Sequence, residues 1–224
     1  MLKARRMSDM IKHIDMANYA RRAHFDYFRA MAYPYVGVTV DVDVTALKDG
    51  CKARGVSFYM AFMHAAALAA DSISEFRQRI AGEGIVEYDE CPTSHIELLE
   101  DGTYCYCTLR HHMPSDEFFA QAASKRAAAR ACASIEEDGD ADSMYFITCL
   151  PKLHYSALVQ PVGGDSNPRI SWRGYRADGA GRLMLPVSVL AHHALIDGSH
   201  IAMFYERLDA QVEQLAKELG ECRG

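Results

Sequence analysis

The sequence predicts an α/β (α+β) two-layer sandwich, in which a mixed β-sheet carries helices packed on one face. Three observations lead to this class. Segments with helical periodicity and segments with strand periodicity are mixed along the 224 residues. Most predicted strands arrive in hairpin-like pairs around a turn that contains glycine. No internal repeat and no low-complexity linker interrupts the chain, so we expect a single domain over residues 1–224.

The first part of the chain is expected to hold one strand among several helices. Residues 1–14 are charged and aperiodic, and we expect them to form a loosely held arm. Asp15 is the expected N-cap of the first helix, which ends at Pro34. Valines at every second position from 36 to 44 predict a strand with one buried face. Two more helices are expected over residues 45–54, stopped by Gly55, and 58–71, capped by Ser57.

The rest of the chain alternates strands and helices in the same way. Helices are expected over residues 115–134, where acidic residues in the first turn suit the helix dipole, and over 199–219. Two short strands are expected within 75–89, and further strands over 93–99, 104–110, 143–150, 155–162, 167–176 and 182–194.

Composition excludes several classes of function. The formal net charge is −6, so the chain carries no basic field for nucleic acid. It contains no apolar run of about 18 residues, and its start lacks the apolar core of a signal peptide. We therefore expect no nucleic-acid partner, no membrane and a cytoplasmic location.

The seven cysteines are odd in number, scattered, and form no Cys-x-x-Cys pair. This pattern is typical of reduced thiols in a cytosol rather than of a disulfide framework. Cys105 and Cys107 lie two positions apart in a predicted strand, but no second pair of ligands accompanies them. We therefore expect no metal site.

The stretch Ala191–Ser199 carries the residues best suited to chemistry. It reads Ala-His-His-Ala-Leu-Ile-Asp-Gly-Ser and joins a predicted strand to the last helix. His193 is a candidate general base, because histidine changes charge near neutral pH. Taken alone, the His-His pair is more often part of a core or a surface. Asp197-Gly198 is equally often a turn that starts a helix.

The segment His192-His193-Ala-Leu-Ile-Asp197-Gly198 resembles the His-His-x-x-x-Asp-Gly motif of chloramphenicol acetyltransferases (type A), which are trimeric, CoA-dependent enzymes. The catalytic domain of dihydrolipoyl acyltransferases carries a related motif. Further matches to the first family follow in order along the chain: Tyr19-Ala-Arg21-Arg22-Ala-His24-Phe25, Ser57-Phe-Tyr59, Glu75-Phe-Arg77, Val86-x-Tyr-Asp89-x-x-Pro92 and Leu183-Met-Leu-Pro-Val-Ser-Val189.

The resemblance implies the fold of CoA-dependent acyltransferases and their mechanism. His193 is then the general base that takes the proton of a substrate hydroxyl as the oxygen attacks acetyl-CoA. Thr148, in Phe146-Ile-Thr148-Cys-Leu-Pro151, matches the family serine that donates to the oxyanion. Threonine keeps the hydroxyl but adds a methyl group and a stiffer χ1. Without the resemblance, Thr148 is an ordinary strand threonine.

The resemblance also implies supporting roles. Asp197 and Arg21 match a structural ion pair that holds the strand end and the histidine ring, although Arg21 alone would be one more solvated helix charge. Ser171 aligns with a family threonine that binds the reacting intermediate through water. Phe28 and Tyr33 match part of the acceptor pocket.

Departures from the family pattern concentrate on the acceptor side. Lys152 stands where the family has tryptophan, and residues 98–104 match the acceptor-side loop poorly. The resemblance implies acetyl-CoA as co-substrate and chloramphenicol or a similar small molecule as acceptor, hence antibiotic resistance. It also implies a homotrimer with active sites at subunit interfaces. The sequence has no Gly-rich phosphate loop of its own, so use of CoA rests on the resemblance.

Alternatives to the chloramphenicol reading remain open. In one alternative, the chain is an acetyltransferase for a different small alcohol. In another, it is a catalytically degenerate trimer that binds or sequesters a small molecule. A dihydrolipoyl acyltransferase core ranks lower, because the sequence has no lipoyl domain and no Pro/Ala-rich linker.

Overall fold

The computed structural model describes residues 11–221. Residues 1–10 of the expected arm therefore lie outside the described residues. The end of that arm is a short strand, β1 (Ile11–His13), which pairs with β4 (Gly84–Tyr88). β3 (Gln78–Ala81) pairs with the other edge of β4 and completes a small antiparallel sheet. The expectation of an aperiodic arm over residues 11–13 was wrong, because β4 offers these residues a backbone ladder that sequence periodicity does not show.

The larger sheet is mixed and has the order β2-β10-β8-β7-β5-β6, with β9 paired to β10. The pairs β8–β7 and β7–β5 are parallel, and the others are antiparallel. The strands are β2 (Tyr35–Asp43), β5 (Thr93–Leu98), β6 (Tyr104–Leu109), β7 (Tyr145–Leu150), β8 (Arg169–Arg173), β9 (Arg176–Ala177) and β10 (Leu183–His192).

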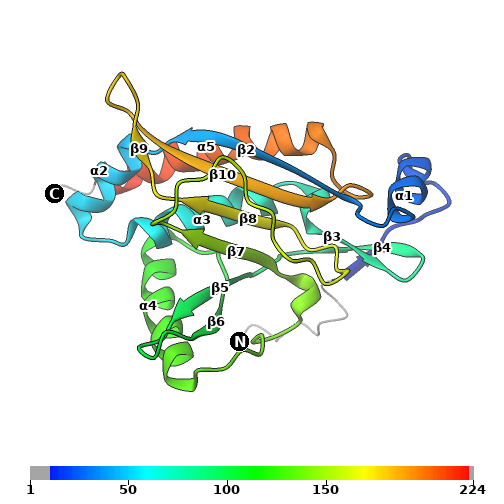
Figure 1. The fold of residues 1–224 in the computed structure, drawn as a ribbon, viewed down its shortest axis with the longest axis horizontal. Helices are drawn as coiled ribbons and strands as arrows, with labels where there is room; N and C mark the ends of the chain where they lie inside the picture. Colours follow the sequence, from blue (N-terminus) through cyan, green and yellow to red (C-terminus); the bar gives the residue numbers. More distant parts are fainter. Residues whose placement is uncertain (1–10, 222–224) are drawn as a thin grey trace.

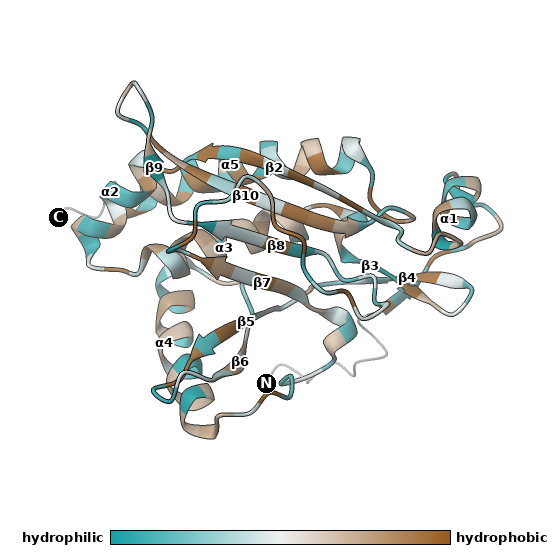
Figure 2. Cartoon of the chain, in the orientation of Figure 1, coloured by the Kyte–Doolittle hydropathy of each residue, from teal (hydrophilic) through white to brown (hydrophobic). Residues whose placement is uncertain are grey.

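Helices cover one face of this sheet, which confirms the predicted two-layer class (Figure 1). The helices are α1 (Arg22–Arg29), α2 (Thr45–Arg54), α3 (Phe58–Asp71), α4 (Ser115–Cys132) and α5 (Gly198–Glu221). α3 is apolar almost all round and lies buried against the sheet, beside α5, which also packs on the sheet. Ser57 caps α3 and Gly55 ends α2 in the left-handed conformation, as predicted. Figure 2 shows hydrophobic residues in several strands of the sheet, among them β7 and β10, which flank β8.

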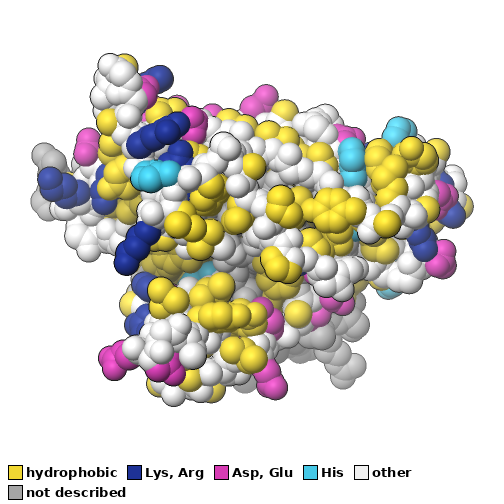
Figure 3. All heavy atoms as spheres, viewed as in Figure 1, with side chains coloured by type: hydrophobic (Ala, Val, Ile, Leu, Met, Phe, Trp, Pro, Cys, Tyr) yellow, Lys and Arg dark blue, Asp and Glu magenta, His cyan; other side chains and the backbone are white. Residues whose placement is uncertain are grey.

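The opposite face of the sheet carries no helix but is crossed by residues 151–168, which run over β7 and β8 (Figure 1). Three apolar side chains of the neighbouring strands stay exposed there: Ile96, Leu98 and Tyr104. In the same view, Figure 3 shows hydrophobic side chains around a hollow over this region. The open face therefore provides both a cavity and an apolar surface.

Two predicted elements differ from the structure. Asp15 caps a local turn through Ala17 N and the Asn18 side chain, so the helix begins only at Arg22. Such short-range bonds compete with helix formation. The strand predicted over residues 155–162 is irregular, because β7 and β8 pair with each other and leave no free edge between them.

The cysteines and the lengths of the helices bear on the expectations drawn from composition. The six cysteines within residues 11–221 are all free, and Cys222 lies outside that range. Among the described helices, none combines the length and the apolar character required to cross a membrane.

Candidate active site

The candidate site begins where β10 ends and α5 starts. Five residues, 193–197, turn the chain between the two elements. The His193 backbone N–H donates to the Pro34 carbonyl at 2.7 Å, and the Ile196 N–H donates to the His192 carbonyl. One hydrogen bond therefore closes the turn, and the other ties it to the residue before β2.

His193 is half-buried, and its ring is held on two sides. Its Nδ1 lies 3.0 Å from the Ile196 carbonyl oxygen, which can only accept a hydrogen bond. The proton is therefore assigned to Nδ1, and Nε2 keeps its lone pair. The ring stacks on Phe28 with centroids 3.9 Å apart and an interplanar angle of 18°. The structure thus presents an oriented imidazole whose Nε2 lone pair is able to accept a proton.

His192 is buried and has a different environment. Burial lowers its pKa to about 4, so the ring is neutral at physiological pH. Its Nδ1 accepts from the Ala194 N–H, and Tyr35 packs edge-on against the ring. Both contacts hold the His192 ring in place.

Asp197 and Arg21 form the pair that the motif match implied. Arg21 Nη2 lies 2.9 Å from Asp197 Oδ2, and Nη1 donates to the Leu195 carbonyl at 2.6 Å. Asp197 Oδ1 accepts from the backbone and hydroxyl of Ser199 and so caps α5. Burial alone would raise the pKa of Asp197, but the Ser199 bonds and the charges of His200 and Arg21 lower it to about 2. The carboxylate is an anchor that stays ionised.

Thr148 lies on β7, on the open face of the sheet. Strand register places it beside Ser171, which lies beside Ser188, which lies beside Thr39. Ser188 and Thr39 hydrogen-bond to each other, so four hydroxyls cross four strands in one row. The Ser171 hydroxyl is buried and has no hydrogen-bond partner among residues 11–221. An unpaired buried hydroxyl is a natural site for an ordered water.

The Thr148 hydroxyl donates to Gln160 Oε1 at 3.2 Å. Gln160 belongs to the segment that crosses the open face, and sequence reasoning missed it because it assigned that segment to a strand.

His193 and Thr148 do not meet within one chain. His193 lies five residues beyond Ser188, the neighbour of Ser171 and hence of Thr148 in the register. At about 3.4 Å per residue, this separation is about 17 Å along the sheet, before the spacing between strands is added. His193 and the candidate oxyanion donor Thr148 are therefore well separated within one chain.

The two aromatic candidates, Phe28 and Tyr33, lie near the His192-His193 pair. Phe28 contacts His193 directly. Tyr33 is 55% exposed and packs against Tyr35, which in turn packs against His192. Tyr33 thus borders the site without touching the base.

A cavity of about 780 Å³ lies beside Thr148, between the crossing segment and β5. Its wall includes Glu97, which is buried and paired with both Arg126 and Arg130. Burial alone would raise the pKa of Glu97, but hydrogen bonds from His95 and Arg126 lower it to about 2. Sequence reasoning missed these three residues, because no motif marks an ion pair between a strand and a helix.

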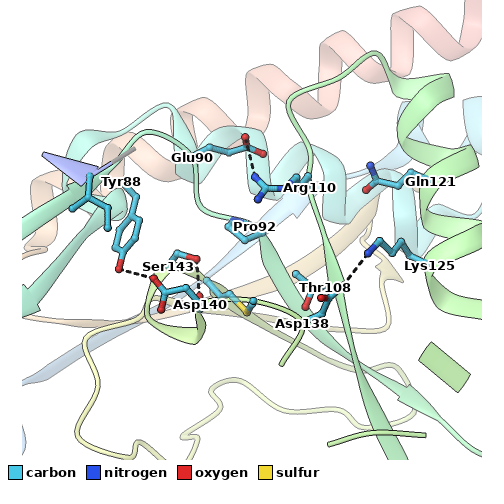
Figure 4. A pocket seen from close by; sticks show the side chains of 13 residues that line it. Tyr88, Glu90, Pro92, Thr108, Arg110, Gln121, Lys125, Asp138, Asp140 and Ser143 are labelled. Carbon is cyan, nitrogen blue, oxygen red and sulfur yellow. Dashed lines mark hydrogen bonds and ion pairs between the residues drawn. The ribbon is translucent and has the colours of Figure 1, made fainter. Parts of the chain in front are cut away.

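A second cavity of about 380 Å³ lies between β4, β6 and α4 (Figure 4). Two ion pairs line it, Glu90–Arg110 and Lys125–Asp138. It contains none of the predicted site residues.

Comparison with known proteins identifies the family of the chain. The family model for chloramphenicol acetyltransferase matches residues 10–209. Chloramphenicol acetyltransferase 3 of Escherichia coli is 26% identical over 199 residues, which cover 87% of this chain and 93% of the relative. Chloramphenicol acetyltransferase 2 of Escherichia coli is 24% identical over 209 residues, which cover 91% of this chain and 98% of the relative.

Solved structures show the same fold. A chloramphenicol acetyltransferase structure has a TM-score of 0.78 at 25% identity and covers 91% of this chain and 100% of that chain. A probable dihydrolipoamide acetyltransferase from Listeria monocytogenes has a TM-score of 0.68 at 16% identity. The match covers 92% of this chain and 94% of that chain. Fold and family together define an acyltransferase. The chain belongs to the chloramphenicol acetyltransferase family.

Proposed function

We propose that this protein transfers the acetyl group of acetyl-CoA to a hydroxyl of chloramphenicol or a similar small molecule, and so confers antibiotic resistance. The observation that carries the proposal is the bond between His193 Nδ1 and the Ile196 carbonyl, which leaves Nε2 free as a base. A base held in the required tautomer takes a proton without first rearranging. The reduced state expected of the scattered cysteines supports a cytoplasmic site of action.

In this mechanism His193 Nε2 takes the proton of the acceptor hydroxyl while the oxygen attacks the thioester carbonyl carbon. The carbonyl oxygen becomes an oxyanion, and the Thr148 hydroxyl donates to it. The carbon–sulfur bond then breaks, and the proton on His193 passes to the departing thiolate. The products are an acetyl ester and free CoA. Phe28, Asp197 and Arg21 hold the imidazole ring and its turn in place.

We further propose a homotrimer in which His193 of one copy faces Thr148 of the next. The separation of about 17 Å along the sheet supports this, because one chain cannot bring the two groups together. The exposed apolar side chains of Ile96, Leu98 and Tyr104 on the open face also favour contact with another copy. A cyclic arrangement repeats the same composite site at every interface.

A mixing experiment tests the composite site. His193→Ala and Thr148→Ala are each expected to abolish or strongly reduce activity. When the two variants are denatured together and refolded, mixed trimers contain some interfaces with both native residues, and activity should return. Failure of activity to return, in mixtures that native mass spectrometry shows to contain mixed oligomers, would argue against a shared site.

The reaction itself is tested by release of CoA thiol from acetyl-CoA in the presence of chloramphenicol. The wild type should release thiol, His193→Ala should not, and His24→Ala should behave as wild type because His24 is exposed on α1. Activity with other alcohols, or with dihydrolipoamide, but not with chloramphenicol would reassign the acceptor. Binding of acetyl-CoA or chloramphenicol without any turnover would instead favour a sequestering protein.

A second candidate keeps this chemistry but changes the acceptor. The cavity beside Thr148 is lined by Arg126, Arg130 and Lys152 against one acid, Glu97. This excess of positive charge favours an acceptor with an anionic group over a neutral one such as chloramphenicol. Comparison of kcat/KM for matched neutral and carboxylated alcohols distinguishes the two.

A further inference from the structure

A cluster of potential metal ligands lies apart from the proposed active site, on the helix-covered side of the fold. It consists of Asp71, the last residue of α3, together with His111 and His112 in the turn before α4. One ligand atom from each residue lies within 4.8 Å of the other two. We propose that these three residues bind a divalent zinc ion. The proposal does not depend on the identity of the reaction or of the acceptor.

Asp71 is oriented as a ligand carboxylate would be. Its Oδ1 accepts hydrogen bonds from the Cys91 N–H at 3.1 Å and from the Tyr145 hydroxyl at 2.9 Å. These two bonds fix the plane of the carboxylate and leave Oδ2 for the histidines. Hydrogen-bonded support of this kind is typical of carboxylates that bind metals.

The two histidines converge on Asp71 Oδ2. His112 Nε2 lies 2.6 Å from it and His111 Nε2 lies 3.4 Å from it. Oδ2 is therefore the point on which both rings converge.

His111 is the observation that favours a ligand over a simple ion pair. Its side chain is completely buried, yet neither ring nitrogen makes a hydrogen bond of good geometry to any described residue. Buried polar groups normally have hydrogen-bond partners, but the His111 imidazole has none among the described residues. A metal ion bound to Nε2 would be such a partner.

Two imidazoles and one carboxylate form a ligand set that zinc accepts readily. Zinc bonds to nitrogen and oxygen are about 2.0–2.2 Å long, so ligand atoms around a tetrahedral ion lie about 3.3 Å apart. The 3.4 Å separation of His111 from Asp71 already matches this value. His112 must move outward from its 2.6 Å contact, and its side chain, which is 50% exposed, is free to do so. The same exposure gives the ion and a fourth, water ligand access from solvent.

The surrounding charges are compatible with a cation. The Arg77 guanidinium binds the Asp71 backbone carbonyl and is paired with Glu87 at 2.7 Å. Arg79 lies beyond Cys91 and directs its donors to backbone carbonyls such as those of Asp142 and Phe76. A bound ion would connect the end of α3 to the turn before α4 and, through Tyr145, to the first residue of β7.

The test uses the untagged chain, freed of metal with a chelator and then titrated with zinc against a chromophoric competitor. The wild type should bind one zinc ion per chain through this site, and zinc should raise its Tm. His112→Ala removes one ligand at a half-exposed position and should weaken binding at least tenfold and abolish the Tm shift. Tyr145→Phe keeps the core volume but loses the support of Asp71, and should weaken binding about tenfold.

His13→Ala is the matched control, because His13 is exposed on β1 and lies outside the cluster. It should bind zinc as the wild type does. Cobalt provides a second readout, since a tetrahedral site gives an intense visible spectrum that His112→Ala should lose. Equal zinc binding by the wild type and His112→Ala, equal losses in His112→Ala and His13→Ala, or no binding by the wild type would each overturn the proposal.

Discussion

Replacing Arg21 by leucine is expected to lower stability and activity together, because one guanidinium holds two points of the turn that carries His193. Arg21 reaches Asp197 at 2.9 Å and the Leu195 carbonyl at 2.6 Å. The side chain of Arg21 is 20% exposed and that of Asp197 is 35% exposed. Both lengths are those of strong, charge-assisted hydrogen bonds.

The magnitude follows from these exposures. A hydrogen bond to a charged group contributes about 1.5–3 kcal/mol, and an exposed ion pair contributes about 0.2–1 kcal/mol. Leu195 is fully buried, so we assign its bond about 1.5 kcal/mol. The partly solvated Asp197 contact is assigned about 1 kcal/mol. Arg21→Leu should therefore destabilise the fold by about 2.5 kcal/mol.

Activity should fall as well, because the released turn carries His193. A displacement of about 1 Å at a reacting group can reduce the rate about 100-fold. We expect kcat to drop about 10- to 100-fold, with a smaller change in KM. Urea unfolding at fixed protein concentration and the thiol-release assay measure the two effects. Fixed concentration is required because oligomer stability depends on it.

Arg22→Leu is the matched control, since Arg22 pairs with Asp26 and both side chains are about half exposed. It should change stability by less than about 0.5 kcal/mol and leave kcat unaltered. A double-mutant cycle of Arg21→Leu with Asp197→Asn should give a coupling energy of about 1 kcal/mol. The reasoning is refuted if Arg21→Leu is no less stable than Arg22→Leu, or if it loses stability and keeps full kcat.

Three further predictions concern single groups. Thr148→Ala should lower kcat about 100- to 1000-fold while Thr148→Ser stays within about tenfold of wild type, and equal losses would exclude an oxyanion donor here. Phe28→Leu removes the ring stacked on His193 and should lower kcat about tenfold at unchanged unfolding free energy; unchanged kcat would deny the ring a positioning role. Glu97 has a depressed pKa, so its contribution to stability is present above its ordinary value of 4.5 and lost as pH falls toward about 2. Glu97→Gln should therefore flatten the fall of the urea midpoint between those pH values, and an unchanged slope would contradict the assignment.

Local patterns predicted most of the secondary structure because the forces that form it are local. The alternating valines from 36 to 44 became β2, and Ser57 and Gly55 cap helices as expected. The segment 155–162 has the composition of a strand but no partner, and pairing is a property of the whole sheet. Asp15 failed as a helix start because its side chain closed a shorter turn.

The residues of the candidate site likewise differ in how far the sequence could predict them. The Arg21–Asp197 pair spans most of the chain and was expected only through the family resemblance, which the geometry matches. Gln160 could not be predicted, since its contact with Thr148 depends on the path of an irregular segment. Asp71 and His111 lie 40 positions apart in the sequence, so no spacing rule joins them. Their proximity arises from tertiary contacts between α3 and the turn before α4.

The bond from Thr148 to Gln160 has a consequence for how a thioester would enter the site. The threonine proton already points at an amide carbonyl oxygen at 3.2 Å. A thioester carbonyl that displaces the glutamine would meet a hydroxyl whose direction is set, and the lost bond would be replaced by one of the same kind. With Thr148 as the proposed oxyanion donor, Gln160 would hold the position of that oxygen in the free protein, and its departure would admit the substrate to a donor that needs no reorientation.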